Sequence, residues 1–249
     1  MLLKLIGCNV FQREACLCIA ESPHVIDIEF TELGEHARSD GLRQLIQAKI
    51  DQTDAGGKTY DAILLLFGLC GNSVAGLHAR RTRLVLPRAH DCCTILLGSK
   101  ERFHELFKDA PSTPFGSAGY LERGDYFLRS DGGAATVQVG DAYAAYVAKF
   151  GERRAKLIWE KLHPAPPEGA DHTAVFIEIP ETAHLGHAAR FREKAQAAGK
   201  EPVMLAGDLR LIRKLIGGEW DAEDFLTVAP GQKIEGVYDW TEIVRAREA

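Results

Sequence analysis

The feature that most constrains the fold is the alternation of short, apolar, strand-like runs with segments whose apolar residues recur at helical spacing. This alternation occupies the first 107 residues and consists of Leu2–Gly7, Gln12–Glu21, Val25–Phe30, Leu42–Ile50, Asp61–Phe67, Arg83–Pro87 and Thr94–Phe107. Strands that alternate with helices are typical of a parallel, doubly wound sheet. We therefore expect an α/β fold with mainly parallel sheets.

A stretch rich in turn-forming residues, Pro111–Gly119, breaks this alternation. A second alternating set follows, made of Ala174–Ile179, His187–Ala198, Pro202–Leu205, Leu209–Ile216 and Phe225–Val228. We expect two Rossmann-like sub-domains, residues 1–112 and 113–249, the second with a helical insertion over 140–163. The cleft between two such units is the expected ligand site.

Composition restricts the partners and the compartment. The net charge of -5 gives no general attraction to nucleic acid or to an anionic membrane surface. No apolar stretch reaches the roughly 20 residues of a membrane-spanning helix, and the start of the chain lacks the layout of a signal peptide. Six cysteines without an export signal are typical of a reducing compartment. We expect a cytoplasmic protein that binds a small molecule, with neither nucleic acid nor membrane as a partner.

Three cysteines come directly after strand-like runs. Cys8 follows the first run, Cys70 follows Asp61–Phe67, and Cys92 follows Arg83–Pro87. In an open parallel sheet, ligands bind outside the carboxyl ends of the strands, so this placement carries three sulfur atoms to one edge. Cys16 and Cys18 fall inside a helical segment instead, where free cysteines are usually small core residues.

Converging thiolates predict either metal binding or covalent chemistry. Cys8, Cys70 and Cys92 are candidate ligands for zinc or for an iron–sulfur cluster, with His90 as a fourth ligand or a proton carrier. Their spacing contains no CxxC pair. A metal-free alternative makes Cys92 or Cys93 the nucleophile and His90 its base, because both thiols precede a helix whose dipole favours thiolate.

Polar residues near the same edge are candidates for acid–base and binding roles. Glu14 is a candidate proton-transfer group, and Asp91 could orient His90 in catalysis. Candidates for substrate binding are Arg88, Asn72, Gly71 and Asp208. Simpler roles remain open: an Arg88–Asp91 ion pair, a helix N-cap by Asp208, and a carboxylate at a helix start for Glu14.

Several blocks of the sequence resemble a known family. They are an early cysteine followed by a glutamate (Cys8, Glu14), the block FGLCGN…GL over Phe67–Leu77, the block LVLPRAHDCCTILLGS over Leu84–Ser99, and a weaker match from Gly207 to Gly231. This pattern resembles the domain-of-unknown-function family 1638 of bacteria and archaea. Because members are often encoded near corrinoid-dependent methyltransferase components, the resemblance implies one-carbon metabolism and a corrinoid protein or methyltransferase as partner.

These observations lead to one expected function and two alternatives. We expect a thiolate-ligated metalloenzyme that acts on a small polar metabolite by methyl transfer, other small-group transfer or lysis. The first alternative is a non-catalytic protein that binds a small ligand or a corrinoid partner. The second alternative is a metal-free, cysteine-dependent enzyme.

Overall fold

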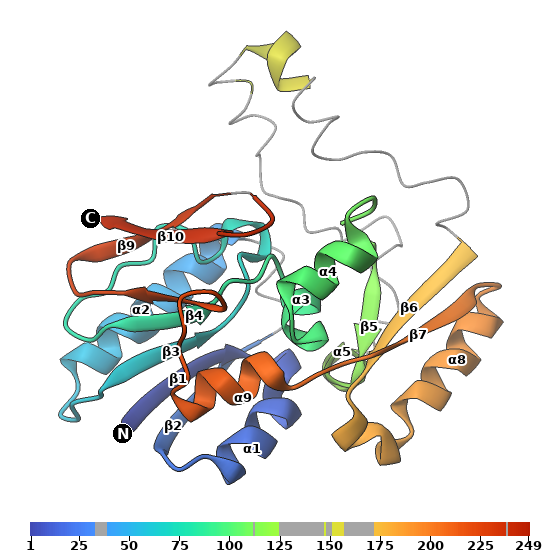
Figure 1. Ribbon diagram of the computed structural model, residues 1–249, viewed down its shortest axis with the longest axis horizontal. Helices are drawn as coiled ribbons and strands as arrows, with labels where there is room; N and C mark the ends of the chain where they lie inside the picture. Colours follow the sequence, from blue (N-terminus) through green and yellow to red (C-terminus); the bar gives the residue numbers. More distant parts are fainter. Residues whose placement is uncertain (33–38, 112, 125–146, 148–150, 157–171, 238) are drawn as a thin grey trace.

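A mostly parallel five-stranded sheet forms the larger part of the molecule (Figure 1). The computed structural model describes residues 1–32, 39–111, 113–124, 147, 151–156, 172–237 and 239–249. The strand order is β2-β1-β3-β4-β8, in which the first four strands are parallel and β8 pairs antiparallel with β4. Their bounds are Leu2–Cys8 (β1), Val25–Thr31 (β2), Ala62–Leu66 (β3), Leu84–Pro87 (β4) and Phe225–Val228 (β8).

The strands form where the sequence is continuously apolar. Every residue of β3 and β4 is buried, as expected for strands that are covered on both faces. Helix α2 (Ser39–Ala55) packs on β1, whereas α9 (Arg210–Gly217) packs on β3 and β4 beside α1 (Gln12–Glu21). Among the described residues, no helix has the length and apolar character needed to cross a membrane.

A smaller, parallel sheet has the order β5-β6-β7, with bounds Phe115–Ser117, Thr173–Glu178 and Glu201–Ala206. Alternate residues of β6 face opposite sides. Val175 and Ile177 belong to the main core, whereas Ala174 and Phe176 pack with Phe191 of α8 (His187–Ala197). The main core therefore includes residues of both sheets.

Three connecting elements lie between the two sheets or follow them. Helix α3 (Cys92–Leu97) follows β4 in the first sheet and contacts β6 in the second, and α4 (Lys100–Phe107) packs on α3. The chain ends in an antiparallel hairpin of β9 (Gln232–Gly236) and β10 (Val244–Glu248).

The expected α/β fold with mostly parallel sheets is confirmed. One strand lies elsewhere than expected, because Phe225–Val228 joins the first sheet along the edge of β4 and not the second unit. The chain returns to the first sheet through α9, which packs on β3 and β4. Most of the expected insertion over 140–163 lies outside the described residues, and the boundary at residue 112 stays a prediction.

The strand order creates a switch point beside β1. Strands β2 and β3 flank β1 on opposite sides, and the carboxyl ends of β1–β4 point the same way because these strands are parallel. In Figure 1, β1 runs from the N-terminus towards the centre of the molecule, where α3 and α5 (Ala118–Gly124) lie. Ligands of open α/β sheets bind at such an edge.

A glycine allows the two sheets to meet at this edge. The short 3-10 helix η1 (Asn9–Phe11), which follows β1, packs directly on α5. A Cβ atom added to Gly119 of α5 would overlap the carbonyl oxygen of Val10 in η1. The close approach of the two backbones therefore requires glycine at this position.

We predict that Gly119→Ala destabilises the protein by about 2 kcal/mol or more, because the added methyl group forces apart two packed backbones. Urea unfolding measures the change. Gly57→Ala is the control, since a Cβ there meets no atom within 4 Å. Equal stabilities of the two variants would show that this contact is loose.

Candidate functional site

Two of the predicted thiols lie together at the carboxyl edge of the first sheet. The Sγ atoms of Cys70 and Cys92 are 4.0 Å apart, within the distance of a weak S–H···S hydrogen bond. Cys70 lies in η3 (Cys70–Asn72) after β3, and Cys92 is the first residue of α3 after β4. The sequence prediction that these two thiols share an edge agrees with this geometry.

Backbone hydrogen bonds between the two loops hold the thiols side by side. The amide of Leu69 donates to the carbonyl of Ala89 (2.8 Å), and the amide of Cys70 donates to the carbonyl of His90 (2.9 Å). A Cβ atom at Gly68 would lie 2.6 Å from Cα of Asp91, so only glycine lets the loops approach this closely.

The third thiol, Cys8, is fully buried at the end of β1. Its charge acts on Cys70, whose pKa is raised well above its ordinary value. The largest cause is the hydrogen bond with Cys92, followed by burial and then by the negative charges of Cys92, Asp91 and Cys8. These effects favour the protonated form of Cys70.

The turn that carries Cys70 has an uncommon backbone conformation. Cys70 has φ = 42° and Asn72 has φ = 73°, both in the left-handed region that residues other than glycine rarely adopt. Gly71 lies between them, and the guanidinium of Arg43 donates to the carbonyl of Asn72 (2.8 Å). Such strain persists where the surrounding structure holds it, often at functional sites.

The predicted metal ligands do not form a recognisable metal centre. Within the part of the chain that the structure describes, no group of three or more His, Cys, Asp or Glu side chains is arranged to hold a metal ion. The zinc or iron–sulfur site with Cys8, Cys70 and Cys92 as ligands therefore stays a prediction. Cys93, the alternative nucleophile, is buried in α3.

His90 lies in an aromatic environment beside the thiol loops. Its ring centroid is 5.6 Å from that of Phe103 and 5.2 Å from that of Trp240. Burial lowers the pKa of His90 to about 4, so the imidazole is neutral at pH 7. Its Nε2 atom is buried without a hydrogen-bond partner in the structure. A ligand could supply that partner.

Two other predicted residues have structural contacts. Asp91 caps α3, since its carboxylate accepts from the backbone amide of Thr94 (3.1 Å). Arg88 donates to the carbonyls of Ala222 (3.0 Å), Glu242 (2.8 Å) and Val244 and so anchors the C-terminal segment. These contacts give both side chains structural roles, and their catalytic and substrate-binding roles stay predictions.

Asp208 lies at the far end of α3 from the thiols. Its backbone amide donates to the carbonyl of Leu96 (2.9 Å), and its exposed carboxylate accepts from the amide of Arg210 (2.8 Å). The helix separates this position from Cys92 by about 8 Å, at 1.5 Å per residue. The structure therefore does not bring Asp208 together with the thiols.

Glu14 is a fully buried carboxyl group in the first turn of α1. Neither of its carboxyl oxygens has a hydrogen-bond partner in the structure. Burial raises its pKa from 4.5 to about 7, and the negative charge of Glu122 adds to the increase. The charged groups that act on the pKa of Glu14 are Glu122, which raises it, and Arg13, which lowers it.

Several buried polar atoms without partners follow the carboxyl ends of strands in the two parallel sheets. Nearly all such atoms in native proteins are hydrogen-bonded, so exceptions require an explanation. In the described part of the chain the exceptions occur at strand ends, in the segments between a strand and the next helix, or in the first two turns of a helix. They belong to Asn9, Glu14, Thr31, Arg43, Ser73, His90 and Ser117. A ligand or ordered water bound beside these atoms would satisfy them.

Sequence reasoning did not identify Thr31 and Ser117, and it wrongly placed Cys16 in the core. Thr31 and Ser117 are single polar residues that end strands, and this signal could have marked them. Thr31 pairs in register with Cys8, which places both residues side by side in the sheet. Cys18 is buried as expected, but Cys16 is exposed, so its expected place in the core was wrong.

We predict that the stability of the protein falls as the pH rises from about 4.5 to 7, because folded Glu14 binds its proton more tightly than unfolded Glu14. At about 1.4 kcal/mol for each pKa unit, the loss attributable to Glu14 is about 3 kcal/mol. Glu14→Gln should remove this loss and be more stable than the unchanged protein at pH 8 but not at pH 4. Urea unfolding of both proteins at pH 4 and pH 8 measures these differences in stability.

Glu21→Gln is the matched control for this prediction. Glu21 lies on the same helix, and its side chain is 67% exposed. The control should leave the pH dependence unchanged. An unchanged pH dependence in Glu14→Gln would contradict the raised pKa of Glu14.

We also predict that Cys92→Ala lowers the pKa of Cys70, because it removes the largest cause of the increase. Alkylation of Cys70 by iodoacetamide at pH 8 should accelerate roughly tenfold for each pKa unit recovered. Peptide mass mapping measures the rate at this residue. Cys16→Ala, a change at an exposed cysteine on α1, is the control and should have no effect.

Comparison with known proteins gives a family and no function. Searches of curated proteins and of solved structures found no significant match. The model of a family described as "Protein of unknown function (DUF1638)" matches residues 30–216. The matched region contains Cys70, His90 and Cys92, whereas Cys8 and Glu14 precede it. Because the match covers well over half of the sequence, the chain belongs to the DUF1638 family.

Proposed function

We propose that this chain is a cysteine-dependent enzyme that binds a small polar metabolite at the carboxyl edge of its first sheet. The observation that carries the proposal is the 4.0 Å separation of the Cys70 and Cys92 sulfur atoms at that edge. We further infer that the ligand enters between two Rossmann-like halves, at the position where open α/β sheets bind ligands. A reducing, cytoplasmic setting would keep both thiols free.

The two thiols would act as a unit. The contact with Cys92, together with burial, raises the pKa of Cys70 and so favours the protonated form of that thiol. The Cys92 thiolate would form a bond to an electrophilic carbon of the substrate, such as a carbonyl carbon. The carbonyl oxygen would then take up a proton, and the Cys70 thiol would donate it.

The polar atoms without partners would orient the substrate. His90, neutral at pH 7, offers Nε2 on the β4 side, and Asn9 offers its Oδ1 atom just after β1. Glu14 titrates near pH 7, which suits a group that exchanges a proton during turnover. Satisfying such buried groups would contribute to ligand affinity, because each unmade hydrogen bond costs about 1–3 kcal/mol.

A thiolate metal centre is the second candidate. The observation that favours it is the action of the Cys8 charge on Cys70, which indicates a third sulfur in the neighbourhood. A soft cation would relieve the repulsion among three thiolates. One-carbon transfer with a corrinoid-bearing partner belongs to this alternative. A protein that binds the same ligand without catalysis would show stabilisation by ligand but no turnover.

Phenylarsine oxide tests the thiol pair, because its arsenic forms bonds to two neighbouring sulfur atoms and releases water. We predict that the reduced protein binds one equivalent, seen as a mass increase and reversed by dithiothreitol. Cys70→Ala and Cys92→Ala should each abolish binding. Cys16→Ala should bind normally, because Cys16 lies on α1 away from the pair.

Two outcomes would overturn the proposal. Binding of the arsenical that persists in Cys92→Ala would show that the two sulfurs do not act together. Stoichiometric zinc or iron in anaerobically purified protein, lost in Cys8→Ser, would favour the metal centre. If neither occurs, a melting-temperature screen of small aldehydes, esters and α-keto acids should find a stabilising compound whose effect is lost in Cys92→Ala.

A further inference from the structure

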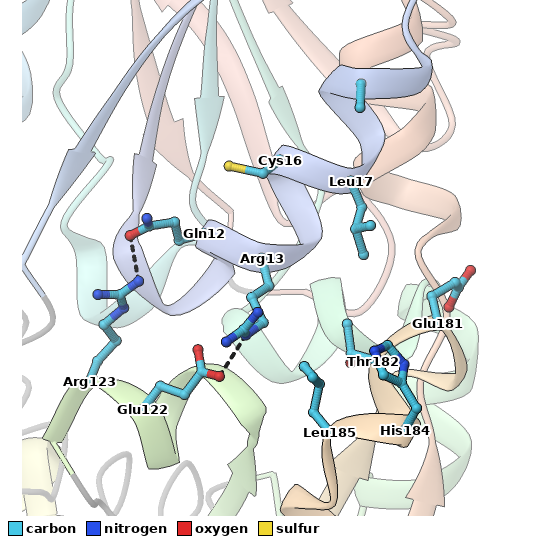
Figure 2. A pocket seen from close by; sticks show the side chains of 11 residues that line it. Gln12, Arg13, Cys16, Leu17, Glu122, Arg123, Glu181, Thr182, His184 and Leu185 are labelled. Carbon is cyan, nitrogen blue, oxygen red and sulfur yellow. Dashed lines mark hydrogen bonds and ion pairs between the residues drawn. The ribbon is translucent and has the colours of Figure 1, made fainter.

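A pocket of about 520 Å³ lies beside α1, and neither Cys70 nor Cys92 lines it. Ligand pockets in proteins usually have volumes of roughly 300–1,000 Å³. Its walls come from α1, the end of α5 and the 3-10 helix η5 (Pro180–Leu185), as Figure 2 shows. The lining residues are Gln12, Arg13, Cys16, Leu17, Ala20, Glu122, Arg123, Glu181, Thr182, His184 and Leu185.

Both carboxylates of the pocket already have cationic partners. Glu122 accepts from Nε of Arg13 (2.6 Å) and pairs with Nε2 of His187 (2.9 Å). Glu181 accepts from a guanidinium nitrogen of Arg213 (2.6 Å). Arg213 and His187 do not line the pocket, so the negative charge of the pocket is balanced partly from outside it.

Besides Arg13, which pairs with Glu122, the pocket has two basic residues without an ion-pair partner among the described residues. Arg123 donates to the amide oxygen of Gln12 (2.6 Å) and forms no ion pair with any other residue that the structure describes. His184 likewise has no carboxylate partner in the described ranges. Arginine presents five N–H donors in a plane that suits a carboxylate, and within the described residues those of Arg123 donate to Gln12 alone.

The pocket also has an apolar surface, formed by Leu17 and Leu185 beside Thr182 and His184 (Figure 2). The side chains of Leu17 and Leu185 are each 40% exposed, although large apolar residues are usually buried. In Figure 2 they point from α1 and η5 into the space between these elements. Ala20 extends this apolar wall along α1.

We propose that this pocket binds an organic anion with an apolar body. The carboxylate would pair with Arg123, and the hydrocarbon would cover Leu17 and Leu185. This arrangement uses the unpaired guanidinium and removes apolar surface from water at once. The proposal does not depend on the thiol chemistry, because the two sites use different residues.

Octanoate is the probe, and the exposed thiol of Cys16 reports its binding. Cys16 lines the pocket, so an occupant should shield it from alkylation. We predict that octanoate slows the labelling of Cys16 by a maleimide several-fold in a saturable manner. Labelling is followed by peptide mapping in the Cys70→Ala, Cys92→Ala double variant, which keeps this measurement separate from the thiol pair.

Two comparison compounds test the contributions of the charge and of the hydrocarbon separately. Octanol carries the same hydrocarbon without charge, and acetate carries the charge without the hydrocarbon. Both should protect Cys16 at least tenfold less well than octanoate, a difference that corresponds to one lost anchoring interaction. Equal protection by octanol would overturn the assignment of an anion site.

Arg123→Gln should weaken the binding of octanoate about tenfold, as expected for the loss of a charge-assisted contact. Arg245→Gln is the control, since Arg245 is an exposed arginine on β10, outside the pocket. It should leave octanoate binding unchanged. Absence of protection in the starting protein, or equal binding by both variants, would contradict the proposal.

Discussion

The parallel pairing of β3 with β4, continued by two backbone hydrogen bonds into the loops that follow, is the interaction on which the site depends. These bonds, from the amides of Leu69 and Cys70, align two chain segments that are about twenty residues apart in sequence. They place the sulfur of Cys70 beside that of Cys92 before any ligand binds. Gly68 makes the approach sterically possible.

The edge that results is polar where the rest of the core is apolar. Buried hydroxyl, amide, imidazole and carboxyl groups without partners occur there in the described residues, although burial of such groups is unfavourable. The left-handed conformations of Cys70 and Asn72 add backbone strain at the same place. Buried groups and strained conformations that lower the stability of a fold are typical of sites that bind or react with a ligand.

Much of the fold could be predicted because the relevant signals are local. Apolar runs marked β1, β3 and β4. The positions of Cys70 and Cys92, a few residues after β3 and β4, predicted that the thiols share an edge. The pairing of β8 with β4 could not be predicted, since the choice of partner depends on where α9 returns the chain.

The contacts of individual side chains were also hard to predict, because they too depend on how distant parts of the chain pack. Arg88 binds carbonyls more than 130 residues away in sequence, and Asp208 lies beyond the end of α3. The exposed position of Cys16 depends on which face of α1 meets the core. That orientation follows from packing against α9, which the spacing of apolar residues in α1 alone did not reveal.

A crystal structure of the reduced protein, grown without oxygen, tests the central claim most directly. Our account predicts the sulfur atoms of Cys70 and Cys92 about 4.0 Å apart and unbridged, with a ligand or ordered water contacting the polar groups around them. A structure in which the two sulfurs point into separate apolar interiors, or in which Cys8, Cys70 and Cys92 share a metal ion, would contradict it.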